Sequence, residues 1–186
     1  MSVEAYRLPT AGTGFRAFVD RLNGPLHEKA LWVYTGVVVL HWLEHLFQAA
    51  QIWWLGMARP EALGALGYLF PWLVKSEVMH FGYAVVMLVG LFLLRPGFAG
   101  AARGWWTASL AIQIWHFIEH STLQVQAIVG TNMFGSPVPT SFLQVFFLRP
   151  ELHLFYNAAV FIPMVVAMWL HTRPTATAGV TCTCAH

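Results

Sequence analysis

The pentapeptide His-x-x-Glu-His occurs twice in this sequence, each time inside a stretch apolar enough to span a membrane. In an α-helix, residues i, i+3 and i+4 lie on one face, so each copy directs two imidazoles and one carboxylate the same way. Ionisable groups at membrane depth are costly, and they usually mark a site inside a bundle. The copies are His41, Glu44 and His45, and His116, Glu119 and His120. Together they predict a buried metal site.

The two motifs belong to an internal duplication. They are offset by 75 residues, and the apolar stretch after each one carries a further His and Tyr at an offset of 73. The matching pairs are Gln51 and Gln126, His80 and His153, and Tyr83 and Tyr156. If each repeat is a hairpin of two spans, both repeats share one orientation, and the pseudo-two-fold axis runs along the membrane normal. The two motif faces then lie opposite each other, with His80 and His153 on the intervening helices.

The composition is that of a membrane protein. The 186 residues are 58% hydrophobic and only 10% charged, whereas soluble domains have about 25% charged residues. The net charge of +2 is too small and scattered to indicate nucleic acid binding. A transmembrane helix needs roughly 20 residues, and residues 30–57, 68–94 and 104–129 provide three such stretches. With a fourth span, the sequence predicts an all-α membrane protein, a four-transmembrane-helix bundle built from two parallel repeats of a helical hairpin.

The fourth span allows two interpretations. Its apolar stretch, 142–170, is interrupted by Arg149-Pro150-Glu151 and by Pro163. Proline is tolerated in the first turn of a helix but kinks a helix interior. Either a short re-entrant or interfacial piece, 142–148, precedes a helix that starts with Pro150, or one long helix kinks at both prolines. We favour the first interpretation. It requires residues 142–148 to fold over the site if His153 is to reach it.

The chain divides into three parts: an N-terminal segment, 1–29; a membrane domain, 30–172, with repeats at about 30–95 and 104–171; and a tail, 173–186. In the first part, Phe15, Phe18, Val19 and Leu22 recur at helical spacing, which predicts an interfacial helix. Arg7, Arg16, Arg21, Lys29, Arg95, Arg103 and Arg173 lie on one side of the predicted spans, against Arg59, Lys75 and Arg149 on the other. This excess of positive charge predicts an integral membrane protein with both termini in the cytoplasm.

The predicted site holds two transition-metal ions between six imidazoles and two carboxylates. Two divalent ions carry four positive charges, which the two glutamates and a bridging oxide or hydroxide largely balance. Imidazole suits iron, copper and zinc, and carboxylates shift the preference toward harder ions. Iron is the first expectation, with copper or zinc as alternatives. Four polar side chains close to the same faces are expected to contact the ligand side chains and orient them, without binding the metal themselves. They are Tyr83, Tyr156, Gln48 and Gln113.

A metal pair buried among lipid-facing helices indicates a gaseous or lipophilic substrate. The first hypothesis is an oxidoreductase that uses dioxygen and receives electrons from an electron-donor protein. Alternatives are a b-type haem protein with two axial histidines, a zinc hydrolase with Glu44 or Glu119 as general base, and a metal transporter. The histidines can also be structural residues bonding across helices, although eight ionisable groups at one depth would be a heavy desolvation cost for packing alone.

Five further residues lie outside the predicted site. Cys182 and Cys184, with His186, form a terminal Cys-x-Cys group that is either a soft-metal clamp or an inert tail. His27 and His171 are expected to be ordinary interfacial residues.

Overall fold

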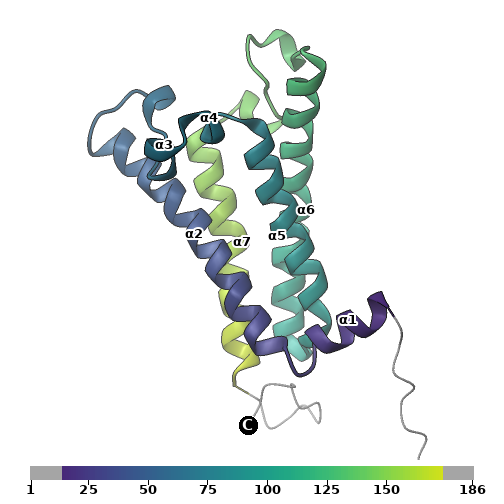
Figure 1. Cartoon of the computed structure of the whole chain (residues 1–186). Helices are drawn as coiled ribbons and strands as arrows, with labels where there is room; N and C mark the ends of the chain where they lie inside the picture. The colour runs from purple at the N-terminus through teal and green to yellow at the C-terminus, as the bar shows by residue number, and fades with distance from the viewer. Residues whose placement is uncertain (1–13, 174–186) are drawn as a thin grey trace, which may run out of the picture.

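The computed structural model describes residues 14–173, and every regular element in this part of the chain is a helix (Figure 1). The predicted all-α class is therefore confirmed. The long helices are α2 (His27–Trp53), α5 (Glu77–Leu94), α6 (Gly100–Val129) and α7 (Arg149–His171). The short ones are α1 (Phe15–Leu22), α3 (Leu66–Leu69) and α4 (Pro71–Val74), with 3₁₀ turns η1 (Arg59–Glu61), η2 (Arg95–Gly97), η3 (Met133–Gly135) and η4 (Leu143–Val145).

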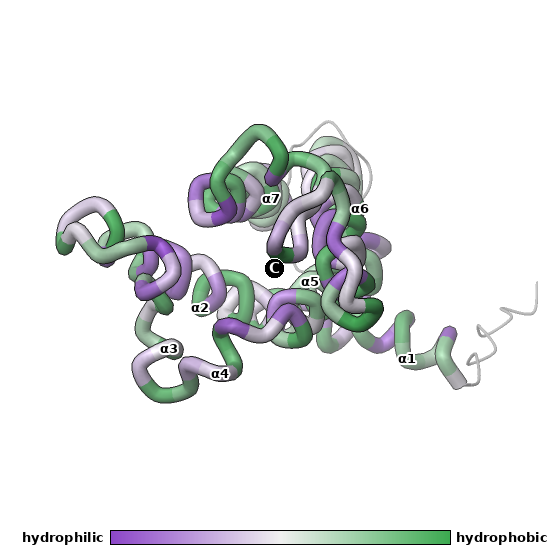
Figure 2. Tube along the Cα trace, turned by 90° about the horizontal axis from the view of Figure 1, so that it is seen from above, coloured by the Kyte–Doolittle hydropathy of each residue, from purple (hydrophilic) through white to green (hydrophobic). Residues whose placement is uncertain are grey.

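The four long helices pack side by side, with α5 and α7 each in contact with both α2 and α6. Seen from above, α2 and α6 therefore occupy opposite corners of the group (Figure 2). α2 is tilted relative to the other three, and its end at Trp53 leans away from them (Figure 1). This end also carries the two long connections, residues 54–76 and 130–148, which contain the short elements α3, α4, η1, η3 and η4.

The opposite end of the helix group holds an apolar core. Trp106 and Leu91 are completely buried there, and the Trp106 indole donates a hydrogen bond of 2.8 Å to the Leu91 carbonyl. The Tyr34 hydroxyl donates one of 2.8 Å to the Met87 carbonyl. Both aromatic side chains thus bury their apolar rings and still satisfy their polar atoms. The core separates the start of α2 and the end of α7 from the histidine-rich half of the molecule.

Among the described residues, three segments are long and apolar enough to cross a membrane: His27–Trp53, Glu77–Gly97 and Arg149–His171. They indicate a membrane protein. α6 is longer than any of them but less apolar, because its inward face is polar. The polar residues buried on that face are Ser109, Gln113, His116, Glu119, His120 and Gln126. α6 as a fourth span, and the repeat organisation, stay predictions.

The predicted start of the second span, at residue 68, is wrong. The chain forms α3 and α4 there, and α5 begins only at Glu77. Pro71 has no N–H to continue a helix from α3, and Ser76 caps α5 by accepting a 3.2 Å hydrogen bond from the Val78 amide. His80 consequently lies in the first turn of its helix. α7 begins at Arg149 with Pro150 in its first turn, as favoured, so His153 has the equivalent position.

The N-terminal helix α1 forms as the spacing of its apolar residues predicts. Its Phe15 and Phe18 side chains are exposed, as expected of a helix that lies against a lipid surface, although its interfacial position stays a prediction. The turn after α1 is fastened to α5 and η2 through Asn23. The Asn23 amide donates to the Leu93 carbonyl at 2.8 Å and accepts from the Gly97 amide at 2.9 Å.

Candidate metal centre

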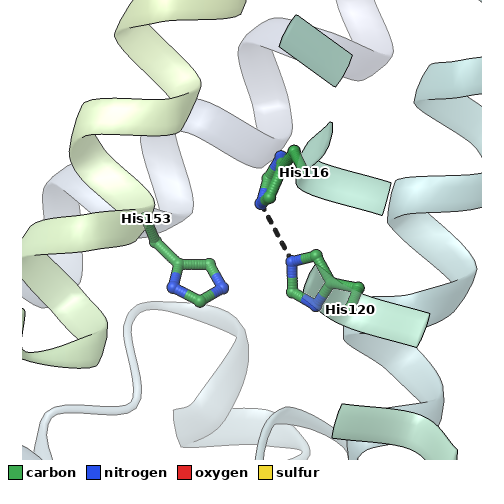
Figure 3. Close-up of side chains that lie close together, drawn as sticks. All are labelled: His116, His120 and His153. Atoms are coloured by element: carbon green, nitrogen blue, oxygen red, sulfur yellow. Dashed lines mark hydrogen bonds between the residues drawn. The ribbon is translucent and has the colours of Figure 1, made fainter. Parts of the chain in front are cut away.

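Three buried histidines from two helices form a group that can hold a metal ion. His116 and His120 project from α6 and His153 from α7, and one nitrogen of each lies within 4.8 Å of the others (Figure 3). The Nε2 atoms of His116 and His120 are 3.0 Å apart. Two nitrogens at right angles on one ion, with bonds of about 2.1 Å, are separated by about 3 Å. The distance between the two Nε2 atoms thus matches chelation of a single ion.

The His153 and His80 rings are both oriented by the backbone. His153 Nδ1 lies 2.8 Å from the Arg149 carbonyl, and His80 Nδ1 lies 3.0 Å from the Ser76 carbonyl. Because a carbonyl only accepts, Nδ1 must carry the proton in both rings, and Nε2 is left with its lone pair. This is the arrangement that metal-ligating histidines use to fix their tautomer. It follows from placing each histidine in the first turn of a helix, four residues after the carbonyl.

His45 has the same arrangement with a side chain as its partner. Its Nδ1 lies 2.8 Å from Gln48 Oε1, as expected for a residue that orients a ligand imidazole. The Nε2 atoms of His45 and His153 are buried and make no hydrogen bond. Leaving a buried polar atom unsatisfied costs about 1–3 kcal/mol, so these two atoms indicate a bound partner such as a cation.

The structure brings all six predicted histidines into one continuous cluster. The ring centroids of His45 and His153 are 5.3 Å apart, which joins the two motifs. His80 lies 6.1 Å from His120 and 6.0 Å from His153, and His41 lies 4.7 Å from His45. His41 and His80 are partly buried and the other four are buried. Ligation by the three first-repeat histidines stays a prediction.

The two motif glutamates contact the connections that follow their helices. Glu44 Oε1 accepts a 2.8 Å hydrogen bond from the Leu66 amide, and Glu119 Oε1 accepts one of 3.2 Å from the Leu143 amide. A carboxylate has about four lone-pair sites, so each can accept an amide and still bind a metal ion. The structure thus gives both glutamates a loop contact that sequence reasoning missed, and their predicted ligation stays open.

The two tyrosines stack on motif histidines in matching ways. The Tyr83 ring lies 4.2 Å from His41, and the Tyr156 ring lies 4.5 Å from His116 and nearly parallel to it. The Tyr156 hydroxyl is buried and lies near the Trp115 side chain, but without hydrogen-bond geometry. Gln113 does not contact a histidine through its amide N–H, which instead donates to the Ala84 carbonyl of α5 at 3.2 Å.

Two glutamines at matching positions fasten the connections over the cluster. Gln51 Oε1 accepts a 2.8 Å hydrogen bond from the Gly64 amide, and its Nε2 donates to the Gly64 carbonyl at 3.3 Å. Gln126 Oε1 accepts from the Met133 amide at 2.8 Å and the Thr140 amide at 3.2 Å, and its Nε2 donates to the Thr140 carbonyl. The shared offset of 75 residues was the sequence signal for this role, which was not predicted.

The two halves of the cluster differ in the space beside them. A cavity of about 350 Å³ lies against His41, Glu44 and Tyr83. The equivalent cavity beside His116, Glu119 and Tyr156 measures only about 10 Å³, since Ser141, Gln144 and Leu152 help to line it. The first motif therefore has an open cavity beside it that the second motif lacks.

A further cavity of about 360 Å³ reaches His45, His80 and His153 from the end that carries the connections. Charged side chains line it, and two of them are held in ion pairs. Arg149 binds both carboxylate oxygens of Glu77, joining α7 to α5. Arg59 binds Glu151 at 2.7 Å, joining η1 to α7. The ion pairs close this end of the helix group around the histidines.

No protein-family model matches the chain, and neither a curated protein nor a solved structure matches it.

Proposed function

We propose that this protein is a membrane metalloenzyme whose two repeats hold a pair of transition-metal ions, used to oxidise a small or lipophilic substrate with dioxygen. The observation that carries the proposal is the cluster of six imidazoles in which Nε2 of His45 and of His153 is buried and unpartnered. Each repeat contributes three histidines and one glutamate. The proposed ligands are His41, Glu44, His45, His80, His116, Glu119, His120 and His153.

Two ions are proposed because each repeat surrounds its histidines in the same way. In both, a tyrosine stacks on the first motif histidine, the motif glutamate accepts a loop amide, and the third histidine is fixed through a backbone carbonyl. A cluster built for one ion would have no need for the second set. The two motif glutamates also favour bare ions over haem, because a neutral iron–porphyrin core needs no carboxylates on its ligand face.

Iron is the proposed metal, because imidazoles with two carboxylates suit an ion of intermediate hardness and because dioxygen chemistry needs a redox-active ion. Such ions, when bound, would supply the electrons that activate dioxygen. An electron-donor protein would then replace those electrons. Copper would serve the same chemistry. A zinc pair would support hydrolysis instead.

The residues around the open cavity define the substrate side. Besides His41 and Glu44, its lining includes Leu40, Leu66, Leu69, Val74 and Met79, which suit an apolar molecule that enters from lipid. Glu44 borders this cavity and has a partner for one oxygen in the Leu66 amide. We therefore assign proton transfer to Glu44, and to Glu119 the support of the enclosed ion.

A transporter is less consistent with the packing. Ion conduction needs polar groups that continue toward both ends of the bundle, whereas Leu91, Trp106 and Met164 close the terminal half without exposed surface. We propose that the protein is an integral membrane protein with both termini in the cytoplasm, and that this closed half faces the cytoplasm.

Elemental analysis with an absorption spectrum tests the proposal. We expect about two iron ions per chain and dioxygen consumption when a reductant and a lipophilic substrate are supplied. Glu44→Gln keeps an oxygen that can accept the Leu66 amide but removes the negative charge. We expect it to slow dioxygen consumption more than Glu119→Gln does. An intense Soret band, or zinc as the only metal, would overturn the proposal.

A further inference from the structure

A second pair of histidines lies at the opposite end of the helix group, where α2 begins and α7 ends. His27 is the first residue of α2 and His171 the last residue of α7, and these two helix ends lie next to each other (Figure 1). Their ring centroids are 5.1 Å apart, with the planes at 75°. The exposed fraction is 0% for His27 and 1% for His171. Far from being interfacial, as the sequence indicated, both side chains are fully buried.

None of the four ring nitrogens of this pair makes a hydrogen bond. A neutral imidazole has one N–H donor and one acceptor, so the pair buries four polar atoms without a partner. Each costs about 1–3 kcal/mol when left unsatisfied. The Leu22 carbonyl lies close enough to His27 to interact with it, but without hydrogen-bond geometry. Packing alone gives no reason to bury two histidines in this way, whereas a shared ligand does.

The surroundings of the pair are apolar and closely fitted. The Phe98 ring lies 5.4 Å from His27 and 4.7 Å from His171, and it stacks on Trp106. Gly97 packs directly against the His27 ring, where any Cβ would overlap it. A glycine at this place lets the backbone approach the imidazole closely. The pocket is therefore shaped around the two rings.

The pair is separate from the six-histidine cluster. His27 precedes His41 by fourteen residues on one helix, which corresponds to about 21 Å at a rise of about 1.5 Å per residue. The apolar core around Trp106 fills the space between them. Within residues 14–173, no third histidine, cysteine or carboxylate completes a three-ligand group with this pair.

We infer that His27 and His171 form a second metal site, which binds a single Cu(I) ion between one nitrogen of each ring. With bonds of about 2.0 Å, two nitrogens on one ion lie at most about 4 Å apart, which rings at this separation allow. Imidazole is a good copper ligand. A divalent ion held by two neutral ligands would keep its full charge in an apolar pocket, at a high desolvation cost. A monovalent ion that is stable with two ligands avoids most of that cost.

The test is a copper titration of the full chain carrying Cys182→Ser and Cys184→Ser. These substitutions remove the thiols that follow His171 in the sequence, since thiolates would compete for Cu(I). Cu(I) is presented anaerobically from a competing chelator to protein purified with its other metals bound. We expect one additional Cu(I) per chain. X-ray absorption at the copper edge should report two or three nitrogen or oxygen neighbours and no sulfur.

Variants assign the bound copper to the pair. His27→Phe and His171→Phe fill similar volume without a metal-binding nitrogen, and each should abolish the additional Cu(I). The matched control is His116→Phe, which should retain it even though the main cluster is damaged. This control also separates failure of the copper site from failure of the proposed enzyme site.

Three outcomes would overturn the copper site. They are no additional Cu(I), Cu(I) retained by both His→Phe variants at the pair, and Cu(I) lost only with His116→Phe. If the two Phe variants do not fold, the absorption spectrum of the Cys-free protein decides. Sulfur ligation, or four or more neighbours, would then contradict the two-histidine site.

Discussion

His45 on α2 and His153 on α7 lie with their ring centroids 5.3 Å apart, and both have Nδ1 hydrogen-bonded and Nε2 unpartnered. His153 also has ring contacts with His80, His116 and His120. It is therefore the histidine on which the two halves of the cluster converge. His41 is at the edge of the cluster, where it contacts His45 and Tyr83.

This difference in position predicts a difference in metal loss. His153→Ala should lower the content from about two ions per chain to nearly none, because both ions lose a ligand or an adjacent support. His41→Ala should lower it to about one. Elemental analysis of detergent-purified protein measures both. Phe155→Ala is the control, since that side chain is 64% exposed two residues away. Equal losses in the two histidine variants would contradict the central position of His153.

The connection after α2 offers a test of how Glu44 is held. Gly56 and Gly64 both have positive φ, at 66° and 73°, so alanine strains both by about 1–2 kcal/mol. Only at Gly64 would the added Cβ overlap the Glu44 carboxylate, whereas at Gly56 it would meet open space. Gly64→Ala should therefore lower metal content and dioxygen consumption. Gly56→Ala should affect stability alone. Equal metal content in the two variants would show that Glu44 is not a ligand.

The Tyr156 hydroxyl is expected to act on a species bound at the metals. It is buried near the Trp115 side chain without forming a hydrogen bond of good geometry, while its ring stacks on His116. Tyr156→Phe keeps the ring, so metal content should be unchanged. The rate of dioxygen consumption should fall about tenfold, which corresponds to about 1.4 kcal/mol of lost transition-state stabilisation. An unchanged rate together with a raised melting temperature would identify the hydroxyl as a packing defect.

The histidine cluster was accessible from the sequence because its geometry is local. The spacing of three and four residues fixes the face of each motif, and duplication adds the partner helix. The start of α5 was misplaced because residues 68–75 are apolar enough for a span, and the breaks at Pro71 and Ser76 outweigh that hydropathy. The burial of His27 and His171 was missed for another reason. It depends on contact between two helix ends that are far apart in the sequence. The local sequence pattern carries no signal for that contact.

The packing of α2 against α5 gives a prediction that is independent of any metal. A Cβ at Gly90 would overlap the Tyr34 ring, whose hydroxyl is bound to the Met87 carbonyl. Overpacking of this kind costs about 1–3 kcal/mol, so Gly90→Ala should lower the melting temperature. Gly82, about two turns earlier on α5, has open space where its Cβ would lie. Gly82→Ala should therefore stabilise the helix by about 0.5–1 kcal/mol. Thermal unfolding in one detergent compares the two. A stabilising effect of alanine at Gly90 would mean that α2 and α5 do not approach each other at Tyr34.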